Sequence, residues 1–475
     1  MTETMLTNRI FTMEDQTRFA AFTSDSNPVH VDPLAARRTQ FGQPIVHGVH
    51  GVLWALDAAA QRGIALKHYR GLQAHFRKPI LLGETVQAFA TSTGKNMSLE
   101  VRVDGLIVTK ITLSPEPPRN LEDAAALDSG AQRTARSTPA NITIEEMAQC
   151  QGSIAYAAPD IGLAFPHAAR EFGNEVLQGL AASTYVVGME CPGLHSIYSR
   201  LTADVGARND GGVTFATTMA DDRARLVQLV MRSACVTARI DTFARRPPVM
   251  GPTMVDAARV VGAGEFAGQR ALVIGGSRGL GAAVAKIVTA GGGEATITYA
   301  RGAAEAAQVA SEIEAAGGRC EMHPYQALDP AMNQLPAALD ANAVYYFATS
   351  PIGRRKTRAF DAALLHEFVR FHVDGFADLA EAMRERSKGR LALFYPSSTY
   401  AAEAPKELGE YGAAKRAGEA IAENLAKLLP EVAIVVERLP PIDTDQNTSV
   451  TAAPTASALD VMVPIARQMQ AALKS

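Results

Sequence analysis

The chain has 475 residues, of which 47% are hydrophobic and 20% are charged, with a formal net charge of −3. This length exceeds what one hydrophobic core supports, so we expect two or three domains. The small net charge argues against binding to nucleic acid or to an anionic membrane. The N-terminus lacks an apolar signal segment and no apolar run reaches a membrane span of about 20 residues, so we expect a cytoplasmic protein. The four cysteines form no Cys-x-x-Cys pair, which predicts neither a zinc site nor a disulfide framework.

The first chemical signal lies near the N-terminus. The segment Asp-Ser-Asn-Pro-Val-His places Asp25 and His30 on either side of Asn27-Pro28, and Val-His-Gly follows at 46–48. Because Asp, Ser, Asn and Pro are turn residues, a simple turn with a partly buried histidine is one interpretation. The next residues, 49–63, have a helical pattern, and 71–80 and 99–114 have strand-like patterns.

The middle third of the chain repeats this order. A helix-like segment at 174–189 precedes strand-like segments at 195–204 and 228–243. Pro-rich stretches at 114–141 and 245–270 resemble linkers. We therefore predict a duplicated α+β unit, with domains at 1–115, 141–247 and 266–475 and linkers at 116–140 and 248–265.

The N-terminal pattern resembles the MaoC-like hydratase/dehydratase group of the hot-dog fold. The resemblance implies that Asp25 and His30 are the catalytic pair, and that the helix entered at Gly48 is the one around which the sheet wraps. The second unit has no Asp-x-Asn-Pro-x-His segment, and we interpret His167 there as structural. A pair with one degenerate half is similar to the double hot-dog hydratases. His50 and Leu53 stand where many relatives carry small or hydroxyl residues, so the pocket shape is expected to differ.

The residue types suit the chemistry that this family implies. Adding water across an α,β-unsaturated thioester needs a base for the water proton and an acid for the α-carbon, which two titratable groups in different environments provide. The developing enolate oxygen needs a preorganised donor, and the helix N-terminus at Gly48 can supply it.

After residue 270 the pattern changes to alternating strands and helices. An apolar strand leads into a glycine loop with Gly275, Gly279 and Gly281 and then into a helix, which predicts a Rossmann-type α/β sheet and a pyrophosphate site. The region 266–445 resembles the short-chain dehydrogenase/reductase family, especially its 3-ketoacyl-thioester reductases. The expected cofactor-binding residues are Gly275, Ser277, Arg278, Gly279, Leu280, Gly281 and Arg301.

The family's Tyr-x-x-x-Lys motif is present as Tyr411 and Lys415, which share one helical face. We expect the ammonium to lower the phenol pKa, so that Tyr411 can protonate the alkoxide. The family's serine maps to Ser398, with Ser397 as the alternative. His372 stands in the slot of the family's catalytic Asn. The second strand is followed by Arg301 rather than an acidic residue, and Arg278 lies in the loop, which favours NADP(H) over NAD.

Together these patterns predict a bifunctional enzyme that acts on acyl-CoA or acyl-carrier-protein thioesters. It would combine (R)-specific enoyl-thioester hydration or 3-hydroxyacyl dehydration with NADP-dependent 3-ketoacyl reduction. The alternative is an active hydratase that carries a non-catalytic, NADP-binding reductase-like domain, because several reductase segments depart from the family pattern. The sequence as read lacks the family's last strand, so we expect a homodimer rather than the usual tetramer.

Overall fold

The computed structural model describes residues 3–127, 130–206, 212–247, 250–352, 359–387, 389–442 and 456–474. Residues up to Pro247 form one compact unit, and most of the chain after it forms a second. Among the described residues, no helix is both long and apolar enough to cross a membrane.

The first unit is built on one sheet of eleven strands, in the order β1-β3-β4-β5-β2-β8-β11-β10-β9-β7-β6. Antiparallel pairing of β2 with β8 joins its two halves, from Gly71 opposite Asp204 to His75 opposite Arg200. Outward from this pair, the first half runs β2-β5-β4-β3-β1 and the second runs β8-β11-β10-β9-β7-β6. In each half, the strand at the pair is the first of four consecutive strands and is followed by the fourth, the third and the second, as expected for a duplicated unit. The strands are β1 (Glu3–Ile10), β2 (Gly71–Phe76), β3 (Thr85–Thr93), β4 (Asn96–Val103), β5 (Leu106–Ser114), β6 (Arg133–Thr134), β7 (Gln151–Ala155), β8 (Ser196–Asp204), β9 (Val213–Asp221), β10 (Leu226–Arg232) and β11 (Thr237–Ala244).

The two longest strand-like patterns are hairpins rather than single strands. The segment 99–114 divides into β4 and β5 at Asp104 and Gly105, which have φ angles of 50° and 77°. Two successive residues with positive φ are typical of the tight turn that joins antiparallel strands. The segment 228–243 likewise divides into β10 and β11.

A long helix packs on the sheet in each half of this unit. The first, α4 (Gly48–Gln61), is buried along most of its length. The second, α9 (Asn174–Tyr185), continues into the π-helical turn η1 (Val186–Glu190). The shorter helices are α1 (Met13–Thr23), α2 (Pro28–Val31), α3 (Pro33–Arg37), α5 (Glu122–Ala125), α6 (Ile144–Ala148), α7 (Ile161–Ala164) and α8 (Pro166–Phe172).

The second unit has a six-stranded, wholly parallel sheet in the order β14-β13-β12-β15-β16-β17. This order is that of the dinucleotide-binding Rossmann fold, which confirms the predicted class. The strands are β12 (Arg270–Ile274), β13 (Glu294–Tyr299), β14 (Arg319–Pro324), β15 (Ala343–Tyr346), β16 (Leu391–Ser398) and β17 (Val432–Leu439).

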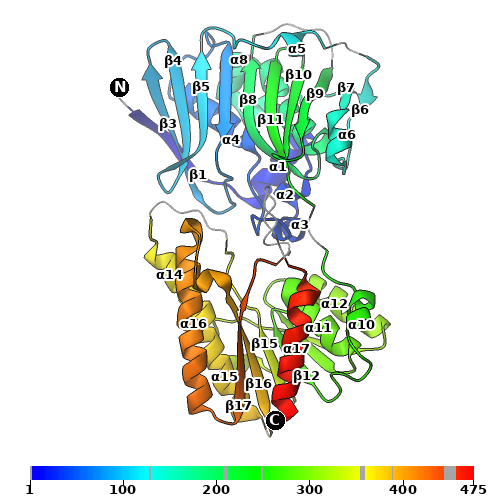
Figure 1. Ribbon diagram of the computed structural model, residues 1–475. Helices are drawn as coiled ribbons and strands as arrows, with labels where there is room; N and C mark the ends of the chain where they lie inside the picture. Colours follow the sequence, from blue (N-terminus) through cyan, green and yellow to red (C-terminus); the bar gives the residue numbers. More distant parts are fainter. Residues whose placement is uncertain are drawn as a thin grey trace. The chain divides into compact units, whose positions relative to one another are not determined.

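Helices cover both faces of this sheet (Figure 1). One face holds α10 (Met254–Val260), α11 (Gly279–Ala290), α12 (Ala303–Ala315) and α17 (Ala458–Lys474). The other holds α13 (Ala331–Gln334), α15 (Gly375–Arg386) and α16 (Gly409–Leu428), with α14 (Ala362–Val369), the π-helical turn η2 (Arg370–Asp374) and the 3₁₀ turns η3 (Thr399–Ala401) and η4 (Lys406–Leu408) nearby. The stretches expected to be linkers contain α5 and β6 in one case and α10 in the other.

Candidate active sites

Asn27 fixes the backbone between Asp25 and His30. Its side-chain oxygen caps α2 by accepting from the Val29 N–H at 3.2 Å, and Pro28 occupies the first helical position. Its amide nitrogen donates to the carbonyls of Gly188 and Gly193, each at 3.0 Å. The turn is thus bound to η1 and to the segment that follows it, as well as to its own helix.

Asp25 is buried, with 1% of its surface exposed. The Thr184 hydroxyl donates to Oδ2 at 2.7 Å, and the Asn27 N–H donates to Oδ1 at 3.3 Å. Burial raises the pKa of Asp25, although the charge of His30 and the hydrogen bond from Thr184 oppose this rise. The carboxyl group is therefore suited to hold and release a proton.

The His30 ring has a fixed orientation. Its Nδ1 lies 2.8 Å from the Ile45 carbonyl, which can only accept, so Nδ1 carries the hydrogen and Nε2 keeps its lone pair. Burial, followed by the charge of His47, lowers the pKa of His30 to about 3. His30 is therefore neutral near pH 7 and can act as a base.

Asp25, His30 and Gly48 border one cavity of ≈ 300 Å³ in the first unit. The α4 helix begins at Gly48 without a side-chain cap, so its first N–H groups have no partner from a capping side chain. A Cβ at Gly48 would lie 2.9 Å from the Phe76 ring, so only glycine fits without displacing that ring. The other residues of the wall are mostly apolar, and include Val29, Phe41, Ile45, Val46, Phe76, Ile80, Val187, Ile197 and Phe243.

Helix α9 and the turn η1, in the second half of this unit, contribute residues that the sequence did not predict. Thr184 and Gly188 line the same cavity, and a Cβ at Gly188 would lie 2.2 Å from Oδ1 of Asp25. A glycine inside a helical pattern often indicates such a close approach, and this signal was present in 174–189. His167 is not among the residues that line this cavity: its backbone N–H donates to Asp57 at 2.7 Å, and its ring contacts Arg170.

In the second unit, the glycine loop follows β12 and enters α11. Gly275 and Gly279 have φ angles of +81° and +57°, and a Cβ at Gly281 would lie 2.3 Å from the Gly275 carbonyl oxygen. The α11 helix begins at Gly279 without a side-chain cap. Tight backbone turns beside an uncapped helix N-terminus fit a dinucleotide diphosphate.

The remaining loop residues lie around this turn. Ser277 is buried, whereas Arg278 and Leu280 are half-buried. Arg301 is exposed and follows β13 with no acidic residue between them. A guanidinium group at this position suits a 2′-phosphate.

Ser398, Tyr411 and Lys415 come together at the end of β16 and the start of α16. Ser398 is the last residue of β16, and its hydroxyl accepts from the Tyr400 N–H at 3.2 Å and lies near enough to Tyr411 to act on the phenol pKa. The Lys415 ammonium lies 5.6 Å from the centre of the Tyr411 ring and donates to the Pro396 carbonyl at 2.5 Å. Ser397 instead contacts Glu419, so Ser398 is the better candidate of the two.

The expected pKa direction at Tyr411 was wrong. Burial raises the pKa of Tyr411, and the nearby Ser398 hydroxyl only partly offsets this rise. Burial also lowers the pKa of Lys415 to about 7, which weakens the cation that was expected to act on the phenol. For each group the cost of removal from water outweighs the opposing contact, which is Ser398 for Tyr411 and Glu419 for Lys415.

His372 lies within η2 and is buried with its ring edge-on to Tyr411, at 5.5 Å between centroids. Burial and the nearby Lys415 lower its pKa well below the ordinary value. A neutral imidazole therefore stands in the slot of the family's Asn.

Comparison with known proteins identifies a family for each unit. Residues 3–110 match the family described as "MaoC like domain", and 269–455 match "short chain dehydrogenase". The chain joins a MaoC-like hot-dog domain to a short-chain dehydrogenase domain.

Three relatives illustrate these matches. The mitochondrial 3-hydroxyacyl-[acyl-carrier-protein] dehydratase of Arabidopsis thaliana is 33% identical over 97 residues, which cover 18% of this chain and 55% of that protein. The (R)-specific enoyl-CoA hydratase of Aeromonas caviae is 38% identical over 74 residues, which cover 15% of this chain and 53% of that protein. This chain therefore spans about half the length of these relatives. A Burkholderia cenocepacia short-chain dehydrogenase in complex with NADP is 25% identical, with 43% and 91% of the two chains covered and a TM-score of 0.39.

Proposed function

We propose that the chain is a bifunctional enzyme of acyl-thioester metabolism. Its first unit would be an (R)-specific enoyl-thioester hydratase/3-hydroxyacyl dehydratase, and its second an NADP-dependent 3-ketoacyl-thioester reductase. The observation that carries the proposal is that Asp25, His30 and the N-terminus of α4 border one apolar cavity. The names of the Arabidopsis and Aeromonas relatives support the acyl-thioester class.

In hydration, the Nε2 lone pair of His30 takes a proton from water while the oxygen attacks the β-carbon. The N–H groups at the start of α4 receive the negative charge that develops on the thioester oxygen. Asp25, whose pKa burial raises, supplies the proton that the α-carbon gains. The three groups surround one cavity, so the water and the double bond are held together.

In reduction, a bound nicotinamide dinucleotide supplies the hydride for the 3-keto carbon. Ser398 would hold the substrate carbonyl by a hydrogen bond, and Tyr411 would deliver the proton that completes the hydroxyl group. Lys415 lies beside the Tyr411 ring and, when protonated, eases loss of the phenolic proton. The glycine loop and the N-terminus of α11 would hold the diphosphate.

We propose NADP(H) because Arg301 is exposed after β13, where an acidic residue would bind the ribose hydroxyls of NAD. An Arg301→Asp variant should lose affinity for NADPH more than for NADH, measured by fluorescence titration.

Turnover assays test the whole proposal. Purified protein should hydrate crotonyl-CoA and should oxidise NADPH with acetoacetyl-CoA, with longer acyl groups and carrier-protein thioesters tried in parallel. Absence of both activities across this panel would refute it. If only hydration is found, and Tyr411→Phe does not alter the slow background oxidation of NADPH, the second unit is a non-catalytic NADP-binding domain.

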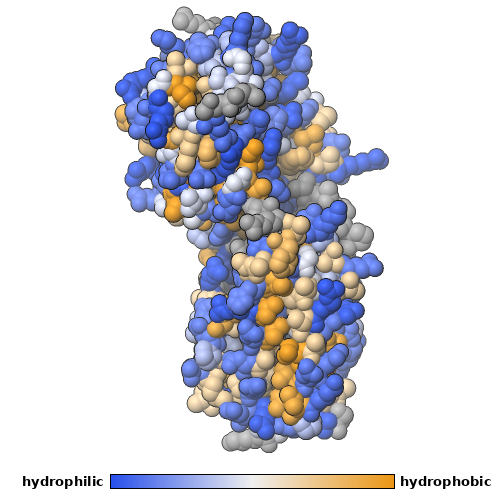
Figure 2. All heavy atoms as spheres, turned by 90° about the vertical axis from the view of Figure 1, so that its left-hand side faces the viewer, coloured by the Kyte–Doolittle hydropathy of each residue, from blue (hydrophilic) through white to orange (hydrophobic). Residues whose placement is uncertain are grey.

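We also propose a homodimer formed through the second unit. The apolar residues that α16 exposes include Ala417, Ala420 and Leu428. Figure 2 shows a band of apolar residues on the side of this unit where α16 lies in Figure 1. Light scattering tests this: a species of four times the 50.4 kDa chain would contradict a dimer.

A further inference from the structure

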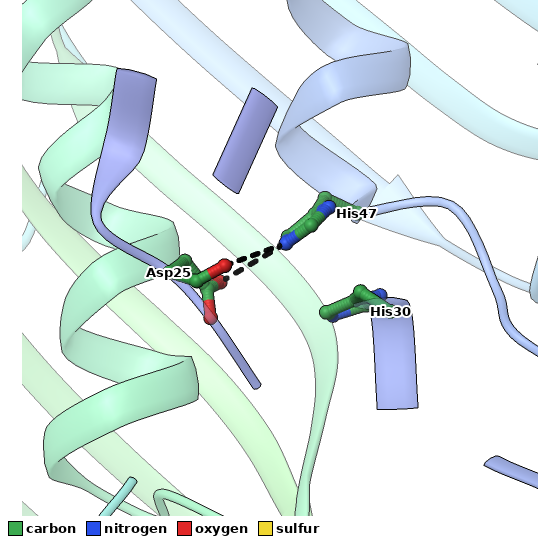
Figure 3. Close-up of side chains that lie close together, drawn as sticks. All are labelled: Asp25, His30 and His47. Atoms are coloured by element: carbon green, nitrogen blue, oxygen red, sulfur yellow. Dashed lines mark hydrogen bonds and ion pairs between the residues drawn. The ribbon is translucent and has the colours of Figure 1, made fainter. Parts of the chain in front are cut away.

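His47 is a buried side chain that the proposed mechanism does not use. It precedes α4 and is fully buried. Its Nε2 lies 3.1 Å from the Asp25 backbone oxygen and 3.9 Å from Oδ2 of the same residue. Its ring is stacked on that of His30, with 3.8 Å between centroids. Figure 3 shows both rings on the same side of Asp25. His47 therefore contacts both members of the expected catalytic pair.

Gln16, which is itself fully buried on α1, holds the His47 ring in this orientation. Its Oε1 accepts from the backbone N–H of His47 at 3.1 Å and lies 3.0 Å from Nδ1. Because a backbone N–H can only donate, this contact fixes which end of the Gln16 amide faces His47. The other end contacts Nδ1 of His50 at 3.3 Å.

A metal ion is the other ligand that these groups suggest. One ligand atom from each of Asp25, His30 and His47 lies within 4.8 Å of the others. However, the two rings are nearly parallel, with 25° between their planes. Their in-plane lone pairs therefore run side by side instead of converging on one ion, as a tetrahedral zinc site requires. The arrangement does not fit a metal centre.

We propose that His47 is a positioning residue for the hydration reaction. A neutral His47 carries one ring N–H, which it donates either to the Asp25 backbone oxygen or to Oε1 of Gln16. It holds the His30 ring through stacking, and Gln16 locks its position by accepting from its backbone N–H. This inference rests on the proposed function of the first unit. Both catalytic groups then keep one orientation toward the cavity, which is the condition for an efficient proton transfer to a bound water.

The position of His47 also has an electrostatic consequence. The titratable groups nearest its ring are Asp25, His30 and His50, and the charge of Arg245 also lowers the pKa of His30. The charge of His47 lowers the pKa of His30, after burial. Loss of His47 should therefore raise the pKa of His30 and move the acidic limb of the rate profile to higher pH, an effect that a merely structural residue would not produce.

His47→Asn tests the proposal in the full chain. We expect kcat for crotonyl-CoA hydration to fall about 30-fold with KM nearly unchanged, and the acidic limb to shift upward. This loss is smaller than the about 10²–10⁴-fold that removal of an acid or base costs, because Asp25 and His30 remain. His50→Asn is the matched control: it removes a neighbouring buried histidine that does not line the cavity and keeps an acceptor for Gln16. It should leave kcat within about threefold. Equal losses in both variants with no pH shift would overturn the proposal, as would a wild-type kcat in His47→Asn.

Two further experiments cover the cases in which His47→Asn does not fold or the wild type is inactive. If His47→Asn fails to fold, as judged by circular dichroism, Gln16→Met removes the lock while leaving the ring in place, and should lower kcat with an unchanged KM. If wild type hydrates no thioester, the proposed function fails separately. The inference is then read from ¹⁵N-histidine NMR of the intact protein: the titration midpoint of His30 should rise in His47→Asn, and an unchanged midpoint would refute it.

Discussion

The hydroxyl of Thr184 donates a 2.7 Å hydrogen bond to the carboxylate of Asp25, although 159 positions separate the two residues in the chain. Thr184 lies on α9 in the second half of the first unit, whereas Asp25 lies between α1 and α2 in the first half. The half without a catalytic motif therefore completes the site of the other half.

Removing this hydroxyl should impair hydration. Thr184→Val deletes the donor to Asp25 but keeps the size of the side chain, and the pKa of the carboxyl group should rise further. A hydrogen bond to a charged group contributes about 1.5–3 kcal/mol, so we expect kcat/KM for crotonyl-CoA to fall about 10- to 100-fold. Thr184→Ser, which keeps the hydroxyl, is the control and should lose much less activity.

The close approach of Gly188 to Asp25 gives a steric test. A Cβ in Gly188→Ala would lie 2.2 Å from Oδ1, so the carboxylate must move and hydration should be largely lost. Gly51→Ala is the matched control on α4, because its Cβ would make only an ordinary 3.7 Å contact with Ile80. Initial rates and circular dichroism of both variants decide the matter: equal rates would show that the contact has no role.

The two activities should be separable. Asp25→Asn with His30→Ala should lower hydration by at least about 10²–10⁴-fold, because the acid and base are both removed, yet leave ketoreduction unchanged. Tyr411→Phe should do the reverse. Hydration and ketoreduction are both measured on each purified variant. If one variant lost both activities to a similar extent, the two residue sets would not act independently.

Lys415 should set the pH dependence of reduction. Its pKa is lowered by burial to about 7, so its ammonium form, which assists Tyr411, is lost as the pH rises through neutrality. We expect kcat/KM for acetoacetyl-CoA to decline above about pH 7, and Lys415→Arg, whose charge persists, to move that decline to higher pH. Lys427→Arg, an exposed change on the same helix, should leave the profile as in wild type.

The buried histidines should make the first unit sensitive to acid. Burial lowers the pKa of His30 and His47 to about 3 and that of His50 well below its usual value. As the pH falls, these histidines therefore bind protons in the unfolded chain before they do so in the folded chain. Their contribution to the free energy of unfolding is complete above about pH 6.5 and is lost progressively as the pH falls toward 3. The loss is up to ~1.4 kcal/mol per pH unit for each ring.

Urea unfolding of the full chain at about pH 7 and about pH 5 measures this loss, read from the transition of the first unit. Asp25, whose pKa is raised, acts in the opposite sense, since its contribution is greatest at low pH and is lost as the pH rises through its folded pKa. His50→Asn should flatten the pH dependence, whereas His68→Asn, at an exposed site, should not. An unchanged slope in His50→Asn would contradict the assignment.

The sequence by itself determined the features that depend on neighbouring residues. Asp25 and His30 flank one turn, the glycines of 275–281 lie in one loop, and Tyr411 and Lys415 are one helical turn apart. Local geometry of this kind follows from spacing and from proline and glycine conformations, which is why the alternating strands and helices after residue 270 also predicted a parallel sheet.

Only the tertiary structure decided what depends on distant segments and on burial. The pairing of β2 with β8 and the packing of α9 bring Thr184 and Gly188 to Asp25, and no local pattern encodes that sheet edge. The packing of α1 on α4 likewise brings Gln16 to His47. Burial also reversed the pKa direction expected at Tyr411, because the cost of removing a charge from water is set by all surrounding atoms and not by one neighbour in the sequence.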